Sequence, residues 1–266
     1  MTTINSYKHG TFSWVELATT DSDAAKKFYG SLFGWTFDDM PMGPDAFYTM
    51  CKLDGKTASA LFKKGADMKD VPTHWGSYLT VDDVDATTAK AKANGGKVMK
   101  EPFDVMDVGR MSVIVDPTGA HFCLWQAKKH IGAQVKNENG ALCWNEIFTT
   151  NVDAAGKFYV NTFGWKTKSV DMGPMGTYTL FNYADAGEKD PNVAGMMPMP
   201  PNMKGIPSHW LAYFQVADCD ASTKKVTELG GKTIAPTMDI PGNIGRFSIV
   251  QDPQGAVFAL FKTTHY

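Results

Sequence analysis

The sequence predicts an α+β protein made of four βαβββ units that pair into two tandem domains. The first observation is that the segment from Gly10 to Trp35 recurs 130 positions later. The second is that a strand–helix–strand pattern restarts within each copy. The matched positions are Trp14, Glu16, Lys27, Phe28, Tyr29 and Gly34-Trp35, repeated as Trp144, Glu146, Lys157, Phe158, Tyr159 and Gly164-Trp165. At 266 residues, the chain is long enough for two domains that each bury a core.

The first unit opens with a strand over residues 11–18. Trp14 and Glu16 share one face of this strand, and Val15 and Leu17 share the other. Because both faces carry bulky side chains, we expect a central strand that is covered on both sides. Glu16 is then a carboxylate placed among aromatic residues.

A helix follows that strand. Asp21 is a suitable N-cap, apolar residues recur at helical spacing through residues 24–33, and Gly34 can end the helix in a left-handed conformation. The second copy has Asn151 and Gly164 in these two roles. The pattern then predicts three short strands, over residues 35–38, 47–53 and 57–62.

The second unit repeats this order. Residues 73–81 read as a strand, Asp82 or Asp83 caps a helix that ends near Asn94, and three strands follow. Those strands are predicted over residues 97–103, 111–115 and 120–126. We therefore predict domains at 8–127 and 141–264 with a polar linker at 128–140. We expect the proline- and methionine-containing stretch 187–205 to be a loop, either a lid or a plain surface insertion.

Composition limits the classes of partner. A formal net charge of −2 and no basic run give no electrostatic footprint for nucleic acid. No apolar run approaches the ~18 residues that suggest a transmembrane helix. The four cysteines are dispersed, without a C-x-x-C pair, and the first residues contain no apolar leader segment. We therefore expect a cytoplasmic protein that binds neither nucleic acid nor membranes.

Several motifs together resemble the vicinal oxygen chelate superfamily, which groups glyoxalases, bleomycin-resistance proteins and extradiol dioxygenases. They are the paired βαβββ units, the F-Y…F-G-W helix and the turns Asp116-Pro117-Thr118-Gly119 and Asp252-Pro253-Gln254-Gly255. The W-x-E and P-x-H-W motifs resemble a two-domain, hydroxylase-like or antigen-type subgroup. The resemblance implies two glyoxalase-like domains whose curved mixed sheets form cups.

The resemblance also implies where a divalent metal would be held. The superfamily's ligand positions fall on Trp14, near Gly76, around Ala60 and on Cys123 in the first domain. In the second domain they fall on Trp144, Leu211, Gly195 and Ala259. These side chains do not supply the usual histidine and carboxylate donors, so we predict no cofactor and no metal site of the usual type. A divalent metal held by Glu16 and His74 is an alternative.

Strand alternation predicts which side chains line each cup. In the first cup these are Glu16, His74 and Tyr78, with Trp14 and Cys123 as further ligand-binding candidates. In the second cup they are Glu146, His209 and Tyr213, with Trp144. The carboxyl and imidazole groups are candidates for general acid–base catalysis, and the aromatic rings are candidates for binding an apolar ligand.

A structural alternative competes with this catalytic reading. Each domain carries a Gly-Arg pair, and Arg110 could neutralise Glu16 as Arg246 could neutralise Glu146. His74 and His209 each follow a proline and precede a tryptophan, a setting that also suits a structural histidine.

Three functions stay open at this stage. The first is a metal-free protein that binds a small, partly apolar molecule. The second is a glyoxalase- or dioxygenase-type lyase or oxygenase that acts on a small oxygenated compound through Glu and His, with or without a metal. The third is an interaction module with vestigial pockets. The fused domains would make a monomer sufficient, and a homodimer is the alternative.

Overall fold

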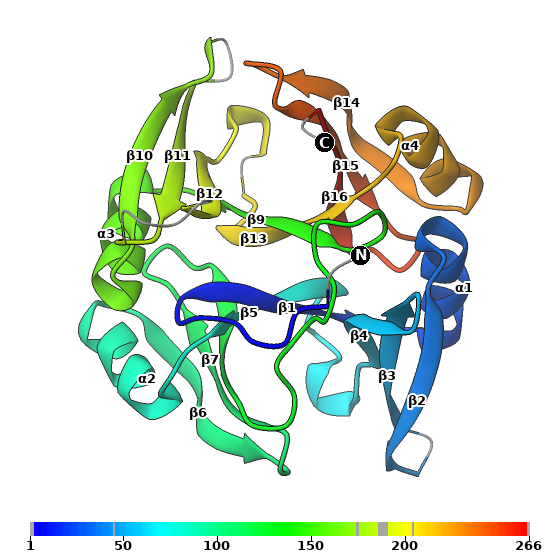
Figure 1. Cartoon of the computed structure of the whole chain (residues 1–266), viewed down its shortest axis with the longest axis horizontal. Coiled ribbons are helices and arrows are strands. Elements are labelled where there is room, and N and C mark those ends of the chain that lie inside the picture. Colours follow the sequence, from blue (N-terminus) through cyan, green and yellow to red (C-terminus); the bar gives the residue numbers. More distant parts are fainter. Residues whose placement is uncertain (1–2, 45, 174–175, 186–190, 204, 265–266) are drawn as a thin grey trace.

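Two eight-stranded sheets, one from each half of the chain, form the computed structural model of this protein (Figure 1). The structure describes residues 3–44, 46–173, 176–185, 191–203 and 205–264. In this part of the chain, four α-helices and 16 strands follow one another as four βαβββ units. The predicted α+β fold is therefore confirmed.

The first half contains two units. The first unit comprises β1 (Thr11–Thr19), α1 (Ser22–Phe33), β2 (Thr36–Gly43), β3 (Ala46–Leu53) and β4 (Lys56–Lys63). The second comprises β5 (His74–Thr80), α2 (Val84–Ala93), β6 (Lys97–Val105), β7 (Gly109–Val115) and β8 (His121–Ala127).

The second half repeats this order. Its first unit comprises β9 (Leu142–Thr149), α3 (Val152–Phe163), β10 (Lys166–Asp171), β11 (Thr177–Asn182) and β12 (Asn192–Pro198). Its second comprises β13 (His209–Gln215), α4 (Cys219–Glu228), β14 (Lys232–Ile240), β15 (Gly245–Gln251) and β16 (Val257–Thr263).

Each sheet is two four-stranded units joined at their central strands. The strand order is β2-β3-β4-β1-β5-β8-β7-β6 in the first half and β10-β11-β12-β9-β13-β16-β15-β14 in the second. β1 pairs with β4 in parallel and with β5 in antiparallel, so each sheet is mixed. Both sheets curve strongly, and their concave faces open away from each other, at the bottom and top of Figure 1. We call these hollows cup 1 and cup 2.

Local sequence signals set the helix ends as predicted. The Asp21 carboxylate accepts hydrogen bonds from the first turn of α1, and Gly34 ends the helix at φ 76°. Asp83 caps α2. The first β strand after α1 is longer than predicted and runs past Asp38 to Gly43, because β2 is an edge strand that tolerates Pro41.

The prediction of a loop over 187–205 is wrong in its central part. Asn192–Pro198 form β12, which pairs with β9 and β11, and the Met196 side chain is buried. The physical reason is the position of the prolines: Pro198 is the last residue of the strand, so no ladder donor is lost within it. Residues 186–190 and 204 lie outside the described residues.

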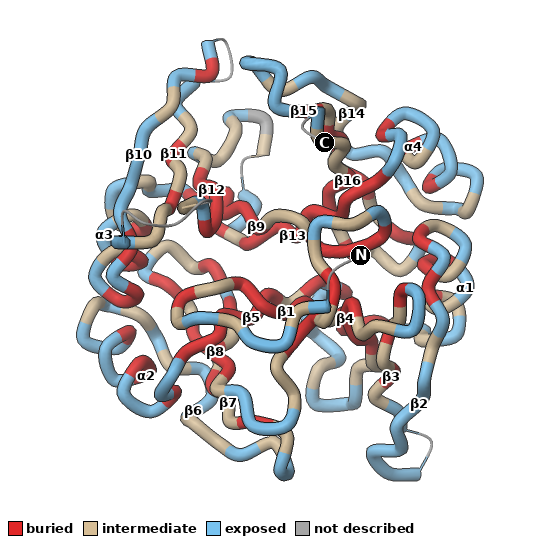
Figure 2. Tube along the Cα trace, viewed as in Figure 1, coloured by how far each residue is buried: buried red, intermediate tan, exposed pale blue. Residues whose placement is uncertain are grey.

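The two halves share their hydrophobic cores. Figure 1 places α1 beside α4 on one flank and α2 beside α3 on the other, between the two sheets. Phe33 of α1 packs on Phe214 of β13 with ring centroids 5.1 Å apart, and Phe158 of α3 packs on Phe122 of β8 at 6.1 Å. Figure 2 shows that the buried residues concentrate along the central strands and the inner helix faces. Each half thus completes the core of the other.

Two hydrogen bonds cross between the halves in a reciprocal way. The Tyr29 hydroxyl donates to Asp252 Oδ2 at 2.9 Å, and the Tyr159 hydroxyl donates to Asp116 Oδ2 at 3.0 Å. Both carboxylates are buried, and their Oδ1 atoms accept backbone N–H groups of their own Asp-Pro-x-Gly turns. The helix tyrosine of each half and the turn aspartate of the other half therefore join each helix to the opposite half.

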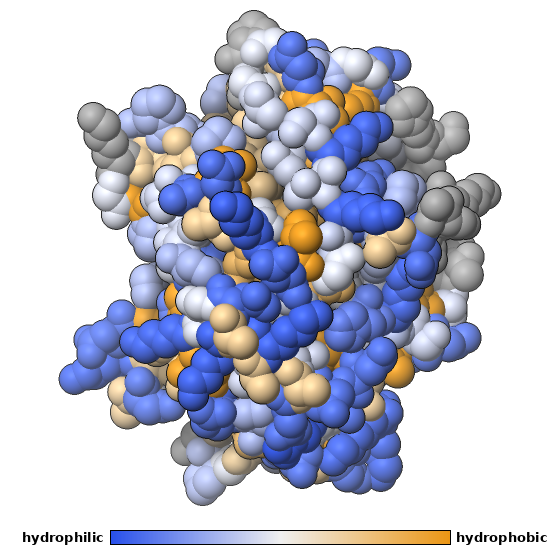
Figure 3. Space-filling view, turned by 90° about the vertical axis from the view of Figure 1, so that its left-hand side faces the viewer, coloured by the Kyte–Doolittle hydropathy of each residue, from blue (hydrophilic) through white to orange (hydrophobic). Residues whose placement is uncertain are grey.

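The linker belongs structurally to the first half. It crosses the first sheet, where Ala133 N donates to the Ser13 carbonyl and Gln134 N donates to the Thr57 carbonyl. Trp35 then donates to the carbonyl of Gly140 at 2.8 Å, which fixes the point where the second half begins. No helix in the described residues is long and apolar enough to cross a bilayer. On the face shown in Figure 3, hydrophilic side chains predominate and hydrophobic ones form small scattered groups.

Removing one crossing hydroxyl should destabilise the whole chain. Tyr159→Phe leaves Asp116 Oδ2 without its phenol and takes the acceptor from Trp210 Nε1, which lies 2.8 Å from the Tyr159 hydroxyl. An unsatisfied buried polar group costs about 1–3 kcal/mol. We expect urea unfolding, followed by tryptophan fluorescence, to show that loss in a single transition.

The matched variant is Tyr29→Phe, which should behave alike because Trp75 and Asp252 repeat the arrangement. Tyr7→Phe is the control, since its hydroxyl only contacts the Ala133 carbonyl within the first half. Separate transitions for the two halves would contradict the shared core.

Candidate functional site

Glu16 lies at the centre of cup 1. It sits on β1, directly opposite Ala60 of β4 on one side and Gly76 of β5 on the other. Strand alternation places its side chain on the concave face with Trp14, while Val15 and Leu17 point to the helices and are fully buried. The carboxyl group is thus presented to the hollow by the backbone of the central strand.

Two phenols hold the Glu16 carboxyl group. The Tyr48 hydroxyl donates to Oε2 at 2.8 Å, and the Tyr78 hydroxyl donates to Oε1. Trp14 Nε1 donates to the Tyr48 hydroxyl at 3.2 Å and so fixes that ring as well. Both phenols use their single O–H donor for a hydrogen bond to Glu16, and the two bonds together fix the orientation of the carboxyl group.

Cup 2 repeats this network. The Tyr213 hydroxyl donates to Glu146 Oε1 at 3.0 Å, and Tyr178 also bonds to the carboxyl group. Trp144 Nε1 donates to the Tyr178 hydroxyl at 2.9 Å. Both cups therefore contain one carboxyl group, two phenols and one indole in the same relation.

Burial raises the pKa of both carboxyl groups. Burial is the largest influence on Glu16, and the hydrogen bonds from Tyr78 and Tyr48 only partly oppose it, so its pKa is raised. The same causes raise the pKa of Glu146 to about 7. The pKa values of the four tyrosines rise as well, through burial and the adjacent carboxylate, so the phenols stay protonated. A carboxyl group with a pKa near neutrality can both donate and accept a proton.

The cysteine and tryptophan candidates line the cups as neutral groups. Cys123 lies beside Tyr78 in the sheet, and burial raises the pKa of its thiol to about 12. Trp14 is almost fully buried, whereas Trp144 is half-buried. Cys123 is therefore a weak nucleophile and part of the apolar wall.

His74 and His209 lie at the rims, away from the carboxyl groups. His74 faces Ala18 across the sheet, two residues beyond Glu16, and is exposed. Its Nδ1 lies 2.8 Å from the Pro72 carbonyl, and His209 Nδ1 lies 2.9 Å from that of Pro207. In each cup the tyrosine, not the histidine, contacts the glutamate.

The proposed pairing of Arg110 with Glu16 and of Arg246 with Glu146 is wrong. Arg110 forms ion pairs with Asp85 at 2.7 Å and Asp104 at 3.6 Å. Arg110 and the buried Ser112 are two residues apart on β7 and therefore share its helix-facing side, whereas Glu16 faces the cup. The physical reason is therefore side-chain direction: the pairs form with the helix on the convex face.

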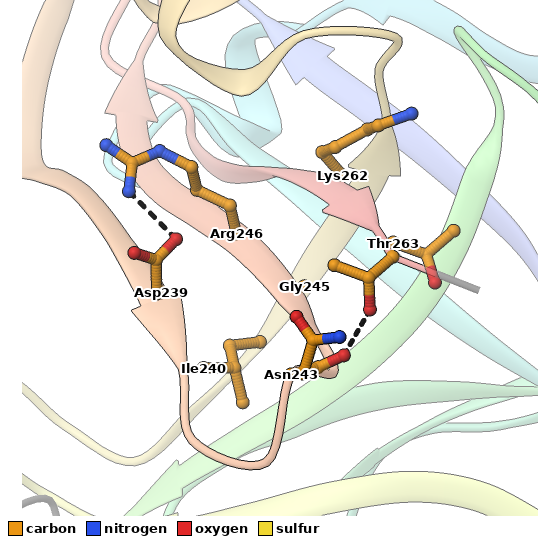
Figure 4. A pocket seen from close by; sticks show the side chains of 8 residues that line it. Asp239, Ile240, Asn243, Gly245, Arg246, Lys262 and Thr263 are labelled. Atoms are coloured by element: carbon orange, nitrogen blue, oxygen red, sulfur yellow. Dashed lines mark hydrogen bonds and ion pairs between the residues drawn. The ribbon is translucent and has the colours of Figure 1, made fainter.

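Arg246 makes the corresponding contacts in the second half. It pairs with Asp220 at 2.7 Å and Asp239 at 2.9 Å. It borders a polar surface hollow of about 650 Å³, in which its guanidinium group turns toward Asp239 (Figure 4). Because both acidic partners already neutralise the arginine, this hollow offers no free positive charge from it.

Sequence reasoning missed three residues of the cups. Tyr48 and Tyr178 were detectable, because they too are 130 positions apart. The third is His130 of the linker, whose ring meets that of Trp14 edge-on at 4.6 Å and closes the floor of cup 1. Burial lowers the pKa of His130 to about 4, so the ring is neutral. Nothing in the polar pattern of the linker marked it as a wall of the cup.

The positions that hold a metal in the resembled superfamily do not fit one here. Ala60 and Gly76 flank Glu16 in the sheet, Ala259 lies beside Tyr213, and none of the three has a donor side chain. Across the described residues, no group of three or more His, Cys, Asp or Glu side chains lies close enough to hold an ion. Each central carboxyl group is instead surrounded by phenols.

Glu146 should make stability depend on pH. Its folded pKa of about 7 exceeds the ordinary 4.5, so the folded state keeps a proton that the unfolded state has lost between these values. The contribution of Glu146 to the free energy of unfolding, measured against Glu146→Gln, is therefore fully present below pH 4.5. It is lost as the pH rises to 7, by on the order of 3 kcal/mol.

Urea unfolding of both proteins across this range measures the difference. Glu101→Gln, at an exposed position, is the control and should differ from the wild type by a constant amount. A Glu146→Gln difference that is equally flat would show that the buried acid ionises normally.

Comparison with known proteins assigns the chain to a family. Residues 11–124 and 141–260 match the model of the Glyoxalase/Bleomycin resistance protein/Dioxygenase superfamily. The chain is 45% identical to CFP32 of Mycobacterium tuberculosis, provisionally named a glyoxylase, over 96% of both chains. It is 33% identical to the anthracycline biosynthesis protein DnrV of Streptomyces peucetius over 95% of this chain and 93% of that protein.

Solved structures agree on the fold. A Mn(II)-bound glyoxalase from Novosphingobium aromaticivorans superposes with a TM-score of 0.65 at 17% identity, over 96% of this chain and 82% of that one. The 2,3-dioxygenase LapB from Pseudomonas sp. KL28 gives 0.66 at 13% identity, over 96% and 93%. The chain thus belongs to the Glyoxalase/Bleomycin resistance protein/Dioxygenase superfamily, with one copy of the domain in each half.

Proposed function

We propose that this protein binds a small, partly apolar organic molecule in a glyoxalase-type cup and orients it by a hydrogen bond to the central glutamate. The observation that carries the proposal is the carboxyl group held by two phenols in both cups. A carboxyl group that is fixed in this way by two donors and a supporting indole is preorganised to bind a ligand in one orientation. Methionine, tryptophan and valine side chains around it supply the apolar wall.

The names of the relatives suggest which molecules to try. DnrV acts in anthracycline biosynthesis, and anthracyclines are flat, mainly apolar and carry hydroxyl and carbonyl groups. CFP32 and a lactoylglutathione lyase from Arabidopsis thaliana, which is 27% identical over 88% of this chain, point to small oxygenated compounds. Both classes offer the hydroxyl or carbonyl oxygen that a glutamate–tyrosine network recognises.

The proposed binding does not use a metal. The glutamate has phenols as its partners, and its neighbours at the superfamily's ligand positions are glycine, alanine and leucine. Even with the Cys123 thiol of cup 1, such side chains leave a divalent ion at most two protein ligands, fewer than the three or more that protein sites usually supply.

A second candidate is an acid–base enzyme of the lyase or isomerase type. The raised pKa of Glu146, about 7, and the raised pKa of Glu16 favour it, because a general base works best near the ambient pH. In such a reaction the glutamate would take a proton from a carbon next to a carbonyl group and return it to the neighbouring position. The phenols, which stay protonated, would stabilise the negative charge.

Ligand binding tests the main proposal. We expect a fluorescent anthracycline to bind the purified protein and to quench its tryptophan emission, since an indole lies in each cup. The double variant Glu16→Gln, Glu146→Gln should bind roughly tenfold or more weakly, because a hydrogen bond to a charged group contributes about 1.5–3 kcal/mol. The double variant Arg110→Lys, Arg246→Lys changes residues outside the cups and is the matched control.

Metal analysis tests the same proposal independently. Purified protein should hold well under one Zn, Ni, Fe or Mn per chain by elemental analysis, and a chelator should leave anthracycline binding unchanged. One equivalent of metal that disappears in Glu16→Gln would overturn the metal-independent proposal.

A further inference from the structure

The two cups are not equivalent in the access they give to their central acid. Glu146 is only 5% exposed, whereas Glu16 is half-buried. The two carboxyl groups have the same partners and the same position on their strands. The difference must therefore come from the side chains that surround them.

Three positions around the acid carry larger side chains in cup 2. Across the sheet from Glu16 lies Gly76, but across from Glu146 lies Leu211, which is 2% exposed. Two residues along the central strand, Ala18 of the first half is replaced by Phe148. Farther into the cup, the Met111 of cup 1 is replaced by Phe247. Leucine and two phenylalanines thus stand in cup 2 where cup 1 has glycine, alanine and methionine.

The opposite flank of Glu146 is closed as well. Gly195 lies beside it, and a Cβ atom at that glycine would come 1.7 Å from the Tyr178 hydroxyl, so the phenol lies directly on the strand backbone. A hollow of about 390 Å³ does reach Trp144 and Cys143 beneath cup 2. Glu146, Tyr178 and Tyr213 are absent from its lining, so it does not open onto the acid.

Space above Gly76 gives cup 1 its access. A Cβ atom at this glycine would make ordinary van der Waals contact with Glu16 and Tyr78, at 3.8–3.9 Å, so a side chain would fit there without a clash. The position that Gly76 leaves without a side chain thus lies directly beside the acid and one of its phenols. Around it, the half-buried side chains of Met50, Met111 and Val108 form the apolar wall of the cup.

We propose that cup 1 alone is the ligand site, that Gly76 is the residue that opens it, and that Leu211 closes cup 2. The ligand carries no negative charge and has an apolar body against the methionines and a hydroxyl or carbonyl end that passes over Gly76 to Glu16. An anionic end would lose its hydration beside the Glu16 carboxyl group, where the cup side chains named here offer no positive charge to pair with. The identity of the ligand rests on the proposed function, while the difference in access rests on packing alone.

Carboxyl labelling of the intact protein tests access without any ligand. A water-soluble carbodiimide with glycinamide, followed by peptide mass spectrometry, gives the modification rate of each glutamate. Glu16 should react roughly tenfold or more faster than Glu146, because a sealed group reacts only through local opening. Gly76→Leu should bring Glu16 down to the rate of Glu146, and Leu211→Gly should raise the rate of Glu146. The exposed Glu101 is the internal reference in every sample.

Equal rates for the two acids in the wild type, or an unchanged Glu16 rate in a folded Gly76→Leu variant, would overturn the proposal. If Gly76→Leu does not fold, the response of Glu146 to Leu211→Gly decides, and no gain there rejects the role of Leu211. Circular dichroism and thermal unfolding report whether each variant is folded.

Anthracycline binding then separates this inference from the proposed function. One molecule per chain, lost in Gly76→Leu and kept in Leu211→Gly, supports both. Binding of two molecules, or binding that Gly76→Leu leaves intact, rejects the assignment to cup 1 while the binding function stands. Labelling that differs as expected without any anthracycline binding rejects the anthracycline as ligand and leaves the difference in access in place.

Discussion

The structure depends on a hydrogen bond that each half donates to the other. A helix tyrosine of one half reaches the aspartate of the Asp-Pro-x-Gly turn in the opposite half, Tyr29 to Asp252 and Tyr159 to Asp116. The same carboxylates hold their own turns through backbone N–H groups. One carboxylate therefore fixes both the local turn and the docking of a distant helix. Because the sheets meet through their convex sides, neither half covers the concave face of the other.

The glutamate networks follow from this arrangement. Helix packing occupies the Val15 and Leu17 side of the central strand, so alternation sends Trp14 and Glu16 into the cup. Among the described side chains, the hydrogen-bond partners of each acid are phenols and not an arginine or an imidazole. A phenol at neutral pH is a donor without charge, so it orients the carboxyl group without suppressing its raised pKa as an arginine would. Each cup thereby keeps a carboxyl group whose pKa stays raised by burial.

Much of this was visible in the sequence. The offset of 130 positions and the cap residues predicted the four βαβββ units, and the period-two pattern placed Glu16 with Tyr78 on one face. The helix partners were not visible, because an apolar stripe such as that of Phe28 and Phe33 shows that a helix is covered but not by which half. Arg110 was misassigned because spacing along the chain says nothing about which face of a later strand a residue occupies.

The different exposure of the two central acids also could not be predicted from the sequence. Gly76 and Leu211 stand at equivalent sites, yet their effect depends on which side chain lies opposite across the sheet. His130 is similar: only the path of the linker brings it to Trp14.

The packing of helices from each half against the other half has a consequence for how the chain can be divided. A fragment cut after the linker exposes the apolar face of α1 and lacks the strands β13 and β16 that cover it, and the other fragment has the same deficit at α3. Each fragment supplies the strands that cover the exposed helix of the other. We therefore expect two separately supplied polypeptides to restore the fold by complementation. The two similar halves thus behave like a pair of subunits that the linker keeps permanently tethered.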